Sequence, residues 1–399
     1  MTNPRKPLQS IFACSFSLLI TGICAIGQPA QADQDRLSEV IRFATFNAAM
    51  SGETADELPQ RLATPDDEKF KKIAAIIQTV RPDVLLINEF DHDPTGQLAA
   101  LFQENYLGVA QGEAEPITFA HAFSPEVNTG LPTGIDLNGD GTVDGAADAH
   151  GWGEYPGQYG MLLLSQAQGE IKAVVDLQSA VWKKFPKSSF PEDYYPVEAQ
   201  KTLRLSSKNH VLLQLAVKDT AFSVFISHPT PPVFDGPEDR NGKRNFDEIS
   251  AIAMICNRSV DQFHRPIVVL GDLNADPNDG ESIPGAMDQL LDNRRFTDPL
   301  PRSRGAVEKA LADGGINAQH QTDPALDTAD WGDQPPRGSG NLRVDYVLPT
   351  HDWTVVDAGV FWPAKDEPGH DWIDASDHRL VWADLKYEVQ PGESAPKKR

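Results

Sequence analysis

The stretch Ile267-Val268-Val269-Leu270-Gly271-Asp272-Leu273-Asn274 carries the signal that decides the fold of this chain. Its first four residues form a short apolar run, which is typical of a strand buried on both faces. Glycine, aspartate and asparagine follow at once, and these residue types favour turns. The stretch therefore predicts a buried strand that delivers polar side chains to the end of a sheet.

Strand and helix signals alternate on either side of this stretch. Phe70, Ile73, Ile77 and Val80 recur at helical spacing, which predicts a helix, and a second helix is predicted over 246–263. The chain is expected to be an α/β protein with at least one antiparallel pair, a hairpin whose turn is 218–220. Further strands are predicted at 41–46, 84–88, 160–164, 211–217, 221–227, 344–348 and 380–385.

The N-terminal segment 1–32 is predicted to be a signal peptide. Arg5 and Lys6 precede an apolar run, and Ala30-Gln31-Ala32 gives the small residues that a signal peptidase recognises. A membrane anchor or lipidation of a cysteine in this segment is the alternative. After removal of the segment no stable membrane insertion is expected, because no other stretch is long and apolar enough, and the protein is predicted to be secreted or periplasmic.

The remaining chain shows no internal repeat and no long linker, so a single domain is predicted over 33–390, followed by a disordered tail at 391–399. Three stretches rich in Gly, Pro, Asp and Asn, at 112–157, 229–243 and 306–340, are predicted to be long loop insertions. Cys256 is the only cysteine outside the signal segment, which predicts a buried thiol and no intramolecular disulfide.

The composition is strongly acidic. The 399 residues include 35 Lys and Arg against 58 Asp and Glu, a net charge of −23. Such a surface repels polyanions and argues against a protein that reads DNA sequence with high affinity. A nucleic-acid substrate remains compatible with it, because divalent metals neutralise phosphate locally, and the charge also suits a protein that holds cations such as calcium.

Polar residues capable of chemistry stand at the ends of the predicted strands. Taken singly, each could be an ordinary strand-end group, a turn residue or a helix cap. Taken together, they indicate an active site at one rim of a sheet. The set comprises Asn47, Glu89, His228, Asp272, Asn274, Asp345, Asp377 and His378.

The order of these residues resembles the motifs of the endonuclease/exonuclease/phosphatase superfamily, which includes pancreatic deoxyribonuclease. The resemblance runs from about 41 to 385 and implies a four-layer α/β/β/α sandwich of two packed mixed sheets, with long loop insertions and the site at one edge. Its motifs are Phe46-Asn47, Asn88-Glu89, Ser227-His228-Pro229, Gly271-Asp272-Leu273-Asn274, Val344-Asp345-Tyr346 and Ser376-Asp377-His378.

The resemblance implies metal-dependent hydrolysis of a phosphoester. Glu89, Asn47 and Asp377 are the expected ligands of Mg²⁺, or of Mn²⁺ in its place, because hard cations prefer carboxylate and amide oxygens. His378 would be oriented by Asp345.

The other three site residues have expected roles as well. Asp272 is the rival of His378 for the role of general base, and Asn274 would hold the phosphate. His228 matches a second histidine of the deoxyribonuclease and sphingomyelinase branches, and it would donate to a phosphoryl oxygen or to the leaving group.

A second metal site is predicted within an insertion at about 130–157. Asp136-Leu137-Asn138-Gly139-Asp140-Gly141-Thr142-Val143-Asp144 places oxygen side chains at every second position and glycine at the sixth, as in calcium loops of the EF-hand type. The twelfth position is Ala147, so Asp148 would take the role of the final acidic ligand. The alternative is an acidic loop without metal. The predicted Ca²⁺ ligands are Asp136, Asn138, Asp140, Thr142 (through its carbonyl), Asp144 and Asp148.

Three basic residues, Arg240, Lys243 and Arg244, follow the His228 motif and are predicted to bind a substrate phosphate, with a solvated loop as the alternative. The expected function is that of a secreted nuclease or other phosphodiesterase. A phosphomonoesterase acting on inositol phosphates or nucleotides, and a non-catalytic calcium-binding surface protein, are the alternatives. The expected partner is a phosphoester substrate, including nucleic acid, and no protein partner is evident.

Overall fold

The computed structural model describes residues 39–387, apart from 235, 264 and 333–337. The predicted signal peptide at 1–32 and the predicted tail at 391–399 lie outside the described residues, so both stay predictions. Across the described ranges, no helix combines the length and the apolar character that crossing a membrane requires.

The larger sheet has six strands in the part of the chain that the structure describes. Its neighbouring strands are antiparallel, except for the first two strands of the chain, which are parallel and are joined by two helices. The spatial order is β12 (Trp353–Val360), β13 (Val381–Tyr387), β1 (Val40–Asn47), β2 (Val84–Asn88), β4 (Met161–Ser165) and β3 (His121–Phe123).

The second sheet has five described strands and again contains one parallel pair, whose crossover contains a long helix. The predicted hairpin is confirmed: Val217 pairs with Thr220, and Lys218 and Asp219 between them adopt the positive φ angles of a tight hairpin turn. The spatial order is β11 (Asp345–Pro349), β8 (Ile267–Asp272), β7 (Thr220–Ser227), β6 (His210–Val217) and β5 (Lys172–Asp176), and a separate small pair is formed by β9 (Ala329–Asp330) and β10 (Asn341–Leu342).

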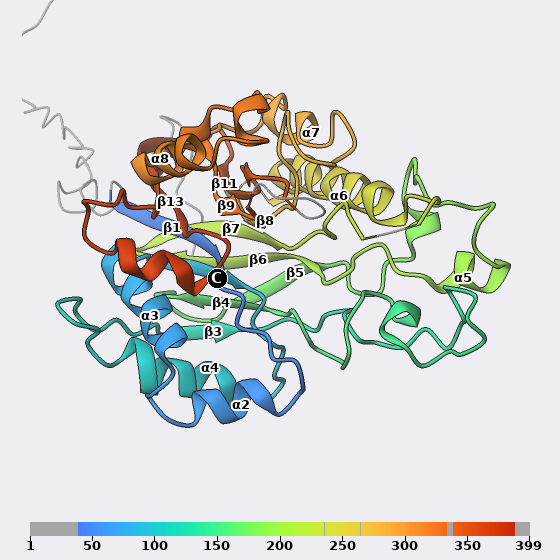
Figure 1. Ribbon diagram of the computed structural model, residues 1–399, viewed down its shortest axis with the longest axis horizontal. Helices are drawn as coiled ribbons and strands as arrows, with labels where there is room; N and C mark the ends of the chain where they lie inside the picture. Colours follow the sequence, from blue (N-terminus) through green and yellow to red (C-terminus); the bar gives the residue numbers. More distant parts are fainter. Residues whose placement is uncertain (1–38, 235, 264, 333–337, 388–399) are drawn as a thin grey trace, which may run out of the picture.

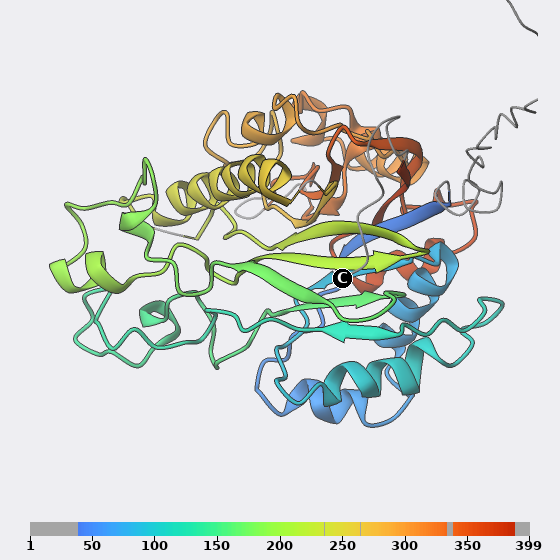
Figure 2. The same cartoon turned by 180° about the vertical axis from the view of Figure 1, so that it is seen from behind.

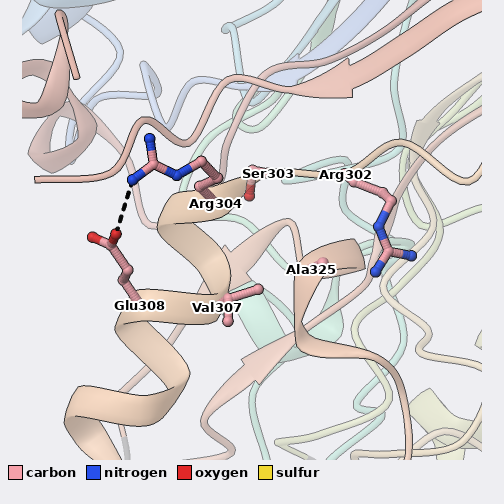
Figure 3. Close-up of a pocket in the computed structure, with 6 residues that line it drawn as sticks. All are labelled: Arg302, Ser303, Arg304, Val307, Glu308 and Ala325. Atoms are coloured by element: carbon pink, nitrogen blue, oxygen red, sulfur yellow. Dashed lines mark ion pairs between the residues drawn. The ribbon is translucent and has the colours of Figure 1, made fainter. Parts of the chain in front are cut away.

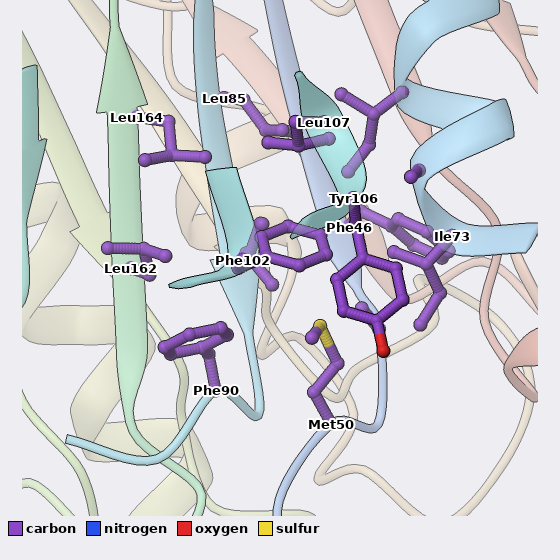
Figure 4. Close-up of a cluster of buried hydrophobic side chains, with 14 of the residues drawn as sticks. Phe46, Met50, Ile73, Leu85, Phe90, Phe102, Tyr106, Leu107, Leu162 and Leu164 are labelled. Atoms are coloured by element: carbon purple, nitrogen blue, oxygen red, sulfur yellow. The ribbon is translucent and has the colours of Figure 1, made fainter. Parts of the chain in front are cut away.

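Helices cover the outer face of each sheet, and the strands lie between them (Figures 1 and 2). Successive residues of β1 point to opposite faces: Phe43 packs between the sheets, and Phe46 packs under the helices. Figure 4 shows the helix-side cluster, in which Phe46, Leu85 and Leu162 meet Ile73 and aromatic side chains. The helices of the first outer layer are α2 (Glu57–Leu62), α3 (Glu68–Val80) and α4 (Gln97–Phe102), and those of the second are α6 (Arg240–Phe263) and α7 (Asp288–Leu291).

Three apolar layers therefore separate four layers of secondary structure, and the predicted α/β/β/α sandwich with two packed mixed sheets is confirmed. Cys256 is buried in the layer beneath α6, as predicted. That position raises the pKa of its thiol through burial.

The structure also contains elements that the sequence patterns did not predict. β12 is an edge strand whose central residues are largely exposed, so it lacks the apolar run of a buried strand. Helix α6 begins at Arg240 rather than at 246, because polar residues form its first turns. The predicted loop at 306–340 contains most of α8 (Arg304–Asp313), and the smaller helices are η1 (Gln103–Leu107), η2 (Ala146–Asp148), η3 (Trp182–Lys184), α5 (Val197–Thr202), η4 (Asn317–Gln319), η5 (Pro324–Leu326) and η6 (His370–Ala375).

Asp327 is a buried carboxylate whose ionisation should destabilise the fold. Burial, and then the nearby charges of Asp276 and Asp279, raise its pKa to about 8. Because the carboxylate ionises near pH 4 in the unfolded chain, stability should fall as the pH rises from about 4 to about 8. We expect Asp327→Asn to leave stability unchanged near pH 4 and to raise it at pH 9, by on the order of 1–3 kcal/mol.

Chemical denaturation at the two pH values, in EDTA, measures this difference. Asn in place of the exposed Asp193 is the matched control and should have no effect at either pH. Equal stabilities of wild type and Asp327→Asn at pH 9 would contradict the prediction.

Candidate active site

The strand ends that carry the predicted site residues meet at one edge of the two sheets. Asn47 pairs with Asn88 at the ends of the parallel strands β1 and β2, and Asp345 at the start of β11 pairs with Asp272 at the end of β8. Parallel strands end at the same edge, and antiparallel neighbours begin there. Seven of the eight predicted residues are joined there by direct contacts: Asn47, Glu89, His228, Asp272, Asn274, Asp345 and His378.

Asn88, which was not predicted to have a role, joins the two sheets beneath this edge. Its buried side-chain amide donates to the carbonyl oxygen of Ser227 at 3.3 Å and accepts from the backbone N–H of Asp272 at 3.3 Å. A buried amide satisfied from both sheets holds them in one relative position. The spacing between Asn47 and Asp272, which come from different sheets, is therefore set by a hydrogen-bonded core residue.

Asp272 is the centre of the cluster and is only 1% exposed. Its Oδ2 accepts from Asn47 Nδ2 at 3.1 Å and lies 3.4 Å from His228 Nε2 and 3.7 Å from His378 Nε2. Burial opposes its ionisation, but the charge of His378 and the contact with His228 outweigh burial and hold its pKa below the usual value. Asn274, at φ +52°, also donates from Nδ2 to this oxygen at 3.3 Å. The site therefore contains an ionised, oriented carboxylate.

His378 and Asp345 form a second part of the cluster. Nδ1 of His378 lies 2.9 Å from Asp345 Oδ2, which also accepts from the Thr328 hydroxyl at 2.8 Å. Burial lowers the pKa of His378, but Asp345 and Asp272 outweigh burial and raise it above the ordinary value. The Trp331 ring packs edge-on against the imidazole, with 5.3 Å between the centroids. The histidine is thus held in one orientation as a charged donor.

The predicted metal ligands Asn47 and Glu89 lie side by side, with Asn47 Nδ2 donating to Glu89 Oε1 at 3.1 Å. Glu89 has a φ of +59°, a conformation that non-glycine residues rarely adopt and that is associated with functional sites. Asp377 is exposed and accepts from Trp331 Nε1 at 3.1 Å. Burial lowers the pKa of Lys69, and the charges of Glu89 and Asp377 oppose that effect. Both carboxylates therefore lie near the Lys69 ammonium group.

Two carboxylates and an amide oxygen are a suitable donor set for a hard divalent cation. Asp272, Asp345 and His378 form a tighter group, with one ligand-type atom of each within 4.8 Å of the others. Two of these residues already bond to each other through His378 Nδ1, so we assign this group to proton chemistry rather than to metal binding.

Lys208 is a site residue that the sequence analysis missed. It lies two residues before the start of β6 and is 7% exposed. Burial lowers the pKa of its ammonium group, whereas the nearby carboxylates of Glu89, Glu248 and Asp272 raise it. Its positive charge in turn adds to burial in lowering the pKa of His228. A lysine in a polar turn resembles a surface residue, and only the fold reveals that this one lies against the cluster.

Glu248 is a second missed residue and underlies this side of the site. It is buried, and its two carboxylate oxygens accept from the backbone N–H groups of Ser207 and Thr230, each at 2.7 Å. These bonds tie the segment before β6 and the segment after β7 to helix α6. Glu248 therefore positions both Lys208 and His228, which lie one and two residues from the bonded Ser207 and Thr230.

The hydrogen bonds of the three basic residues predicted to bind phosphate go to groups outside this cluster. Arg244 is 2% exposed, and its guanidinium donates to the carbonyl oxygens of Leu205, His150 and Arg204. Lys243 donates to the carbonyl oxygen of Glu238, and Arg240 contacts Asn241. The placement of Arg244 does not fit a phosphate-binding role, because α6 begins early enough to turn this residue into the interior. Of the predicted calcium ligands, Asp136, Asn138, Asp140 and Asp148 are joined by hydrogen bonds within a separate loop at 136–148.

An open pocket of about 470 Å³ lies beside α8, at the start of that helix (Figure 3). Its lining contains none of the clustered site residues, and its arginines are already paired, Arg302 with Asp323 and Arg304 with Glu367. The polar edge, and not this pocket, is therefore the candidate active site. The pocket is lined by Arg302, Ser303, Arg304, Val307, Glu308 and Ala325.

Comparison with solved structures finds proteins of similar fold at low identity. An endonuclease/exonuclease/phosphatase protein from Beutenbergia cavernae is 19% identical, with 87% of this chain and 72% of that chain covered and a TM-score of 0.48. The human Nocturnin catalytic domain with bound sulfate is 15% identical, with coverages of 88% and 95% and a TM-score of 0.45. A mannosyl-6-phosphatase from Bacteroides thetaiotaomicron is 13% identical, with coverages of 86% and 99% and a TM-score of 0.44.

A search of curated proteins finds no match. A model of the Endonuclease/Exonuclease/phosphatase family, in contrast, matches residues 44–378. The match includes the whole polar edge, from Asn47 to His378. This chain therefore belongs to the endonuclease/exonuclease/phosphatase family.

Proposed function

We propose that this protein is a metal-dependent phosphodiesterase, with nucleic acid as its most suitable class of substrate. The family comprises hydrolases of phosphoesters, among them nucleases and phosphatases. The observation that carries the proposal is the buried contact of ionised Asp272 with the Asp345–His378 pair, because it places a proton acceptor beside a charged donor. Phosphoester hydrolysis needs both, one for the attacking water and one for the phosphoryl oxygens.

The pKa directions divide the work between these groups. Asp272, whose pKa is lowered, is ionised at neutral pH and can orient a water molecule and accept its proton. His378, whose pKa is raised, is protonated and donates to a phosphoryl oxygen, while Asp345 holds its ring. Mg²⁺ or Mn²⁺, held by Asn47, Glu89 and Asp377, would supply Lewis-acid stabilisation of the phosphoryl group when bound.

An aromatic pair at the rim favours a substrate with a planar group. Trp152 is 49% exposed, and its ring lies 6.1 Å from that of Tyr159, between centroids. Burial raises the pKa of Tyr159 most, and the negative charge of Glu89 has the second largest effect. The tyrosine is therefore close to the polar edge. Bases stack on exposed aromatic side chains, whereas an inositol ring offers no aromatic face. This pair supports a nucleotide-containing substrate over an inositol phosphate.

Lys208 is expected to bind a non-bridging oxygen of the substrate phosphate. We expect Lys208→Met to lower kcat/KM by about 10- to 100-fold, mainly through KM, because a charge-assisted hydrogen bond contributes roughly 1.5–3 kcal/mol. Steady-state kinetics on a soluble diester measures this loss. Lys243→Met is the matched control and should change kcat/KM less than about threefold. A larger loss in the control than in Lys208→Met would assign phosphate binding to the residue predicted from sequence.

The segment at 1–32 supports export, and we include secretion or a periplasmic location in the proposal on the basis of its Arg5-Lys6, apolar and Ala30-Gln31-Ala32 signals. Cell fractionation with N-terminal sequencing of the product tests it. Recovery outside the cytoplasm with a new N-terminus after Ala32 is the expected result. Retention of the intact N-terminus in the cytoplasm would overturn this part of the proposal.

The activity is tested with plasmid DNA, bis-p-nitrophenyl phosphate and p-nitrophenyl phosphate, each with Mg²⁺ or with EDTA, using wild type and His378→Ala. We expect Mg²⁺-dependent cleavage of DNA and of the diester, and its loss in the variant. Release of nitrophenol from the monoester alone would favour the phosphomonoesterase alternative. No turnover of any substrate by folded wild type would favour the non-catalytic alternative.

A further inference from the structure

The acidic insertion at 136–148 lies in the long loops that extend beyond the strand ends, on the right of Figure 1 and on the left of Figure 2. Its first aspartate closes a tight turn. Asp136 Oδ1 accepts from the N–H of Gly139 at 2.6 Å, and its Oδ2 accepts from the N–H of Gly141 at 2.9 Å. Asn138 Oδ1 and Asp140 Oδ1 likewise accept from the N–H groups two residues ahead, at 3.0 and 2.8 Å. Several side-chain oxygens are thereby gathered within one short turn.

A buried carboxylate closes the other end of this insertion. Asp148 is 1% exposed, and its Oδ1 accepts from the N–H of Leu137, the second residue of the turn, at 2.7 Å. Its Oδ2 is fully buried and has no hydrogen-bond partner among the described residues. The carboxylate lies against the turn, because its other oxygen accepts from the N–H of Leu137 within that turn. Burying a carboxylate oxygen without a partner is costly, and a bound cation removes that cost.

We propose that this insertion binds one Ca²⁺ ion, separate from the catalytic cation, through Asp136, Asn138, Asp140 and Asp148. The donors are all oxygens and include three carboxylates, the ligand type and charge that Ca²⁺ prefers. The carbonyl of Thr142 and the carboxylate of Asp144 are available in the same turn to complete the six to eight oxygens that this ion takes. Asp148 thus replaces the acidic residue that the EF-hand pattern has one position earlier.

The ion has a structural role in this proposal, because the insertion supports one wall of the active site. Leu137 is buried with Trp182 and Leu205, which anchors the turn to the protein. The carbonyl oxygen of His150, two residues beyond Asp148, accepts from buried Arg244. Shortly before the insertion, the N–H of Asn128 donates to the carbonyl oxygen of Lys208 at 3.1 Å. Ca²⁺ would therefore hold the loop that contacts the segment bearing Lys208.

The test is a calcium titration of the purified protein by calorimetry, with thermal unfolding in Ca²⁺ and in EGTA. Wild type is compared with Asp136→Asn/Asp140→Asn, with Asp148→Asn, and with Asp193→Asn as the exposed control. Glu89→Gln serves to separate the two metal sites. We expect wild type, Asp193→Asn and Glu89→Gln each to bind one Ca²⁺ ion at the insertion. Each should also show a rise in Tm of at least about 5 °C when Ca²⁺ is added.

The double variant and Asp148→Asn should lose that site and that rise in Tm. In EGTA the double variant should unfold within about 2 °C of wild type, because half-buried Asp136 and exposed Asp140 matter to stability chiefly through the ion. Equal calcium stoichiometry in wild type and the double variant, or no calcium binding by wild type, would overturn the proposal. Loss of the site in Glu89→Gln alone would assign the calcium to the catalytic edge and would also overturn it.

Discussion

His378→Ala is expected to lower kcat/KM for a phosphodiester by about 10³-fold, the largest effect of any single substitution in this protein. His378 Nε2 lies 3.7 Å from Asp272 Oδ2, and its Nδ1 is held by Asp345 at 2.9 Å. Alanine removes both the charged donor and the group that keeps the pKa of Asp272 low. Kinetics at pH 7 in saturating Mg²⁺ measures the loss.

Substitution of Asp345 tests whether Asp345 and His378 act as a unit. We expect Asp345→Asn to cost about 10²-fold, and the double variant with His378→Ala to be no worse than His378→Ala alone, because residues that act together are not additive. Losses that multiply in the double variant would mean that the two residues contribute independently. His351→Ala removes an exposed histidine and serves as the control, with activity unchanged.

Arg244→Met is expected to lower the free energy of unfolding by about 3–5 kcal/mol, the largest stability effect predicted here. The arginine side chain is buried, lies over the Trp182 ring at 5.4 Å, and donates to three carbonyl oxygens. Methionine fills part of the volume but leaves those carbonyl oxygens without their donor. Urea denaturation measures the change in midpoint.

The matched control for this substitution is Arg258→Met, at an exposed position on the same helix, which should cost less than about 0.5 kcal/mol. Residual activity of Arg244→Met at low temperature separates the structural role from the predicted phosphate-binding role. We expect KM to stay within about threefold of wild type in the folded fraction. Unchanged stability together with a large rise in KM would restore the phosphate-binding interpretation.

Several features followed from short stretches of sequence. The apolar runs of β2 and β8 identified buried strands, because a strand enclosed on both faces needs consecutive apolar residues. Edge strand β12 has no such run and was missed, since it packs on one face only. The polar residues that end the buried strands were likewise recognisable, because their order along the chain matches the family's motifs.

Other features depended on contacts between distant segments. Lys208 and Arg244 are both basic residues in polar stretches, and from sequence Arg244 was predicted to bind phosphate whereas Lys208 was not. The structure places Lys208 near Asp272 and Glu89, and it turns Arg244 into the interior beneath His150. Asn88 similarly gained its role only from the approach of Ser227 in the other sheet.

The sequence by itself determined the family, the layered α/β architecture and the edge at which the chemistry gathers, because each depends on local apolar runs and on the residues that directly follow them. The tertiary structure alone decided which basic residue lies at the site, which carboxylates are ionised there, and that Asp148 keeps a buried oxygen without a partner. Burial and hydrogen-bond partners set these properties, and they come from segments far apart along the chain.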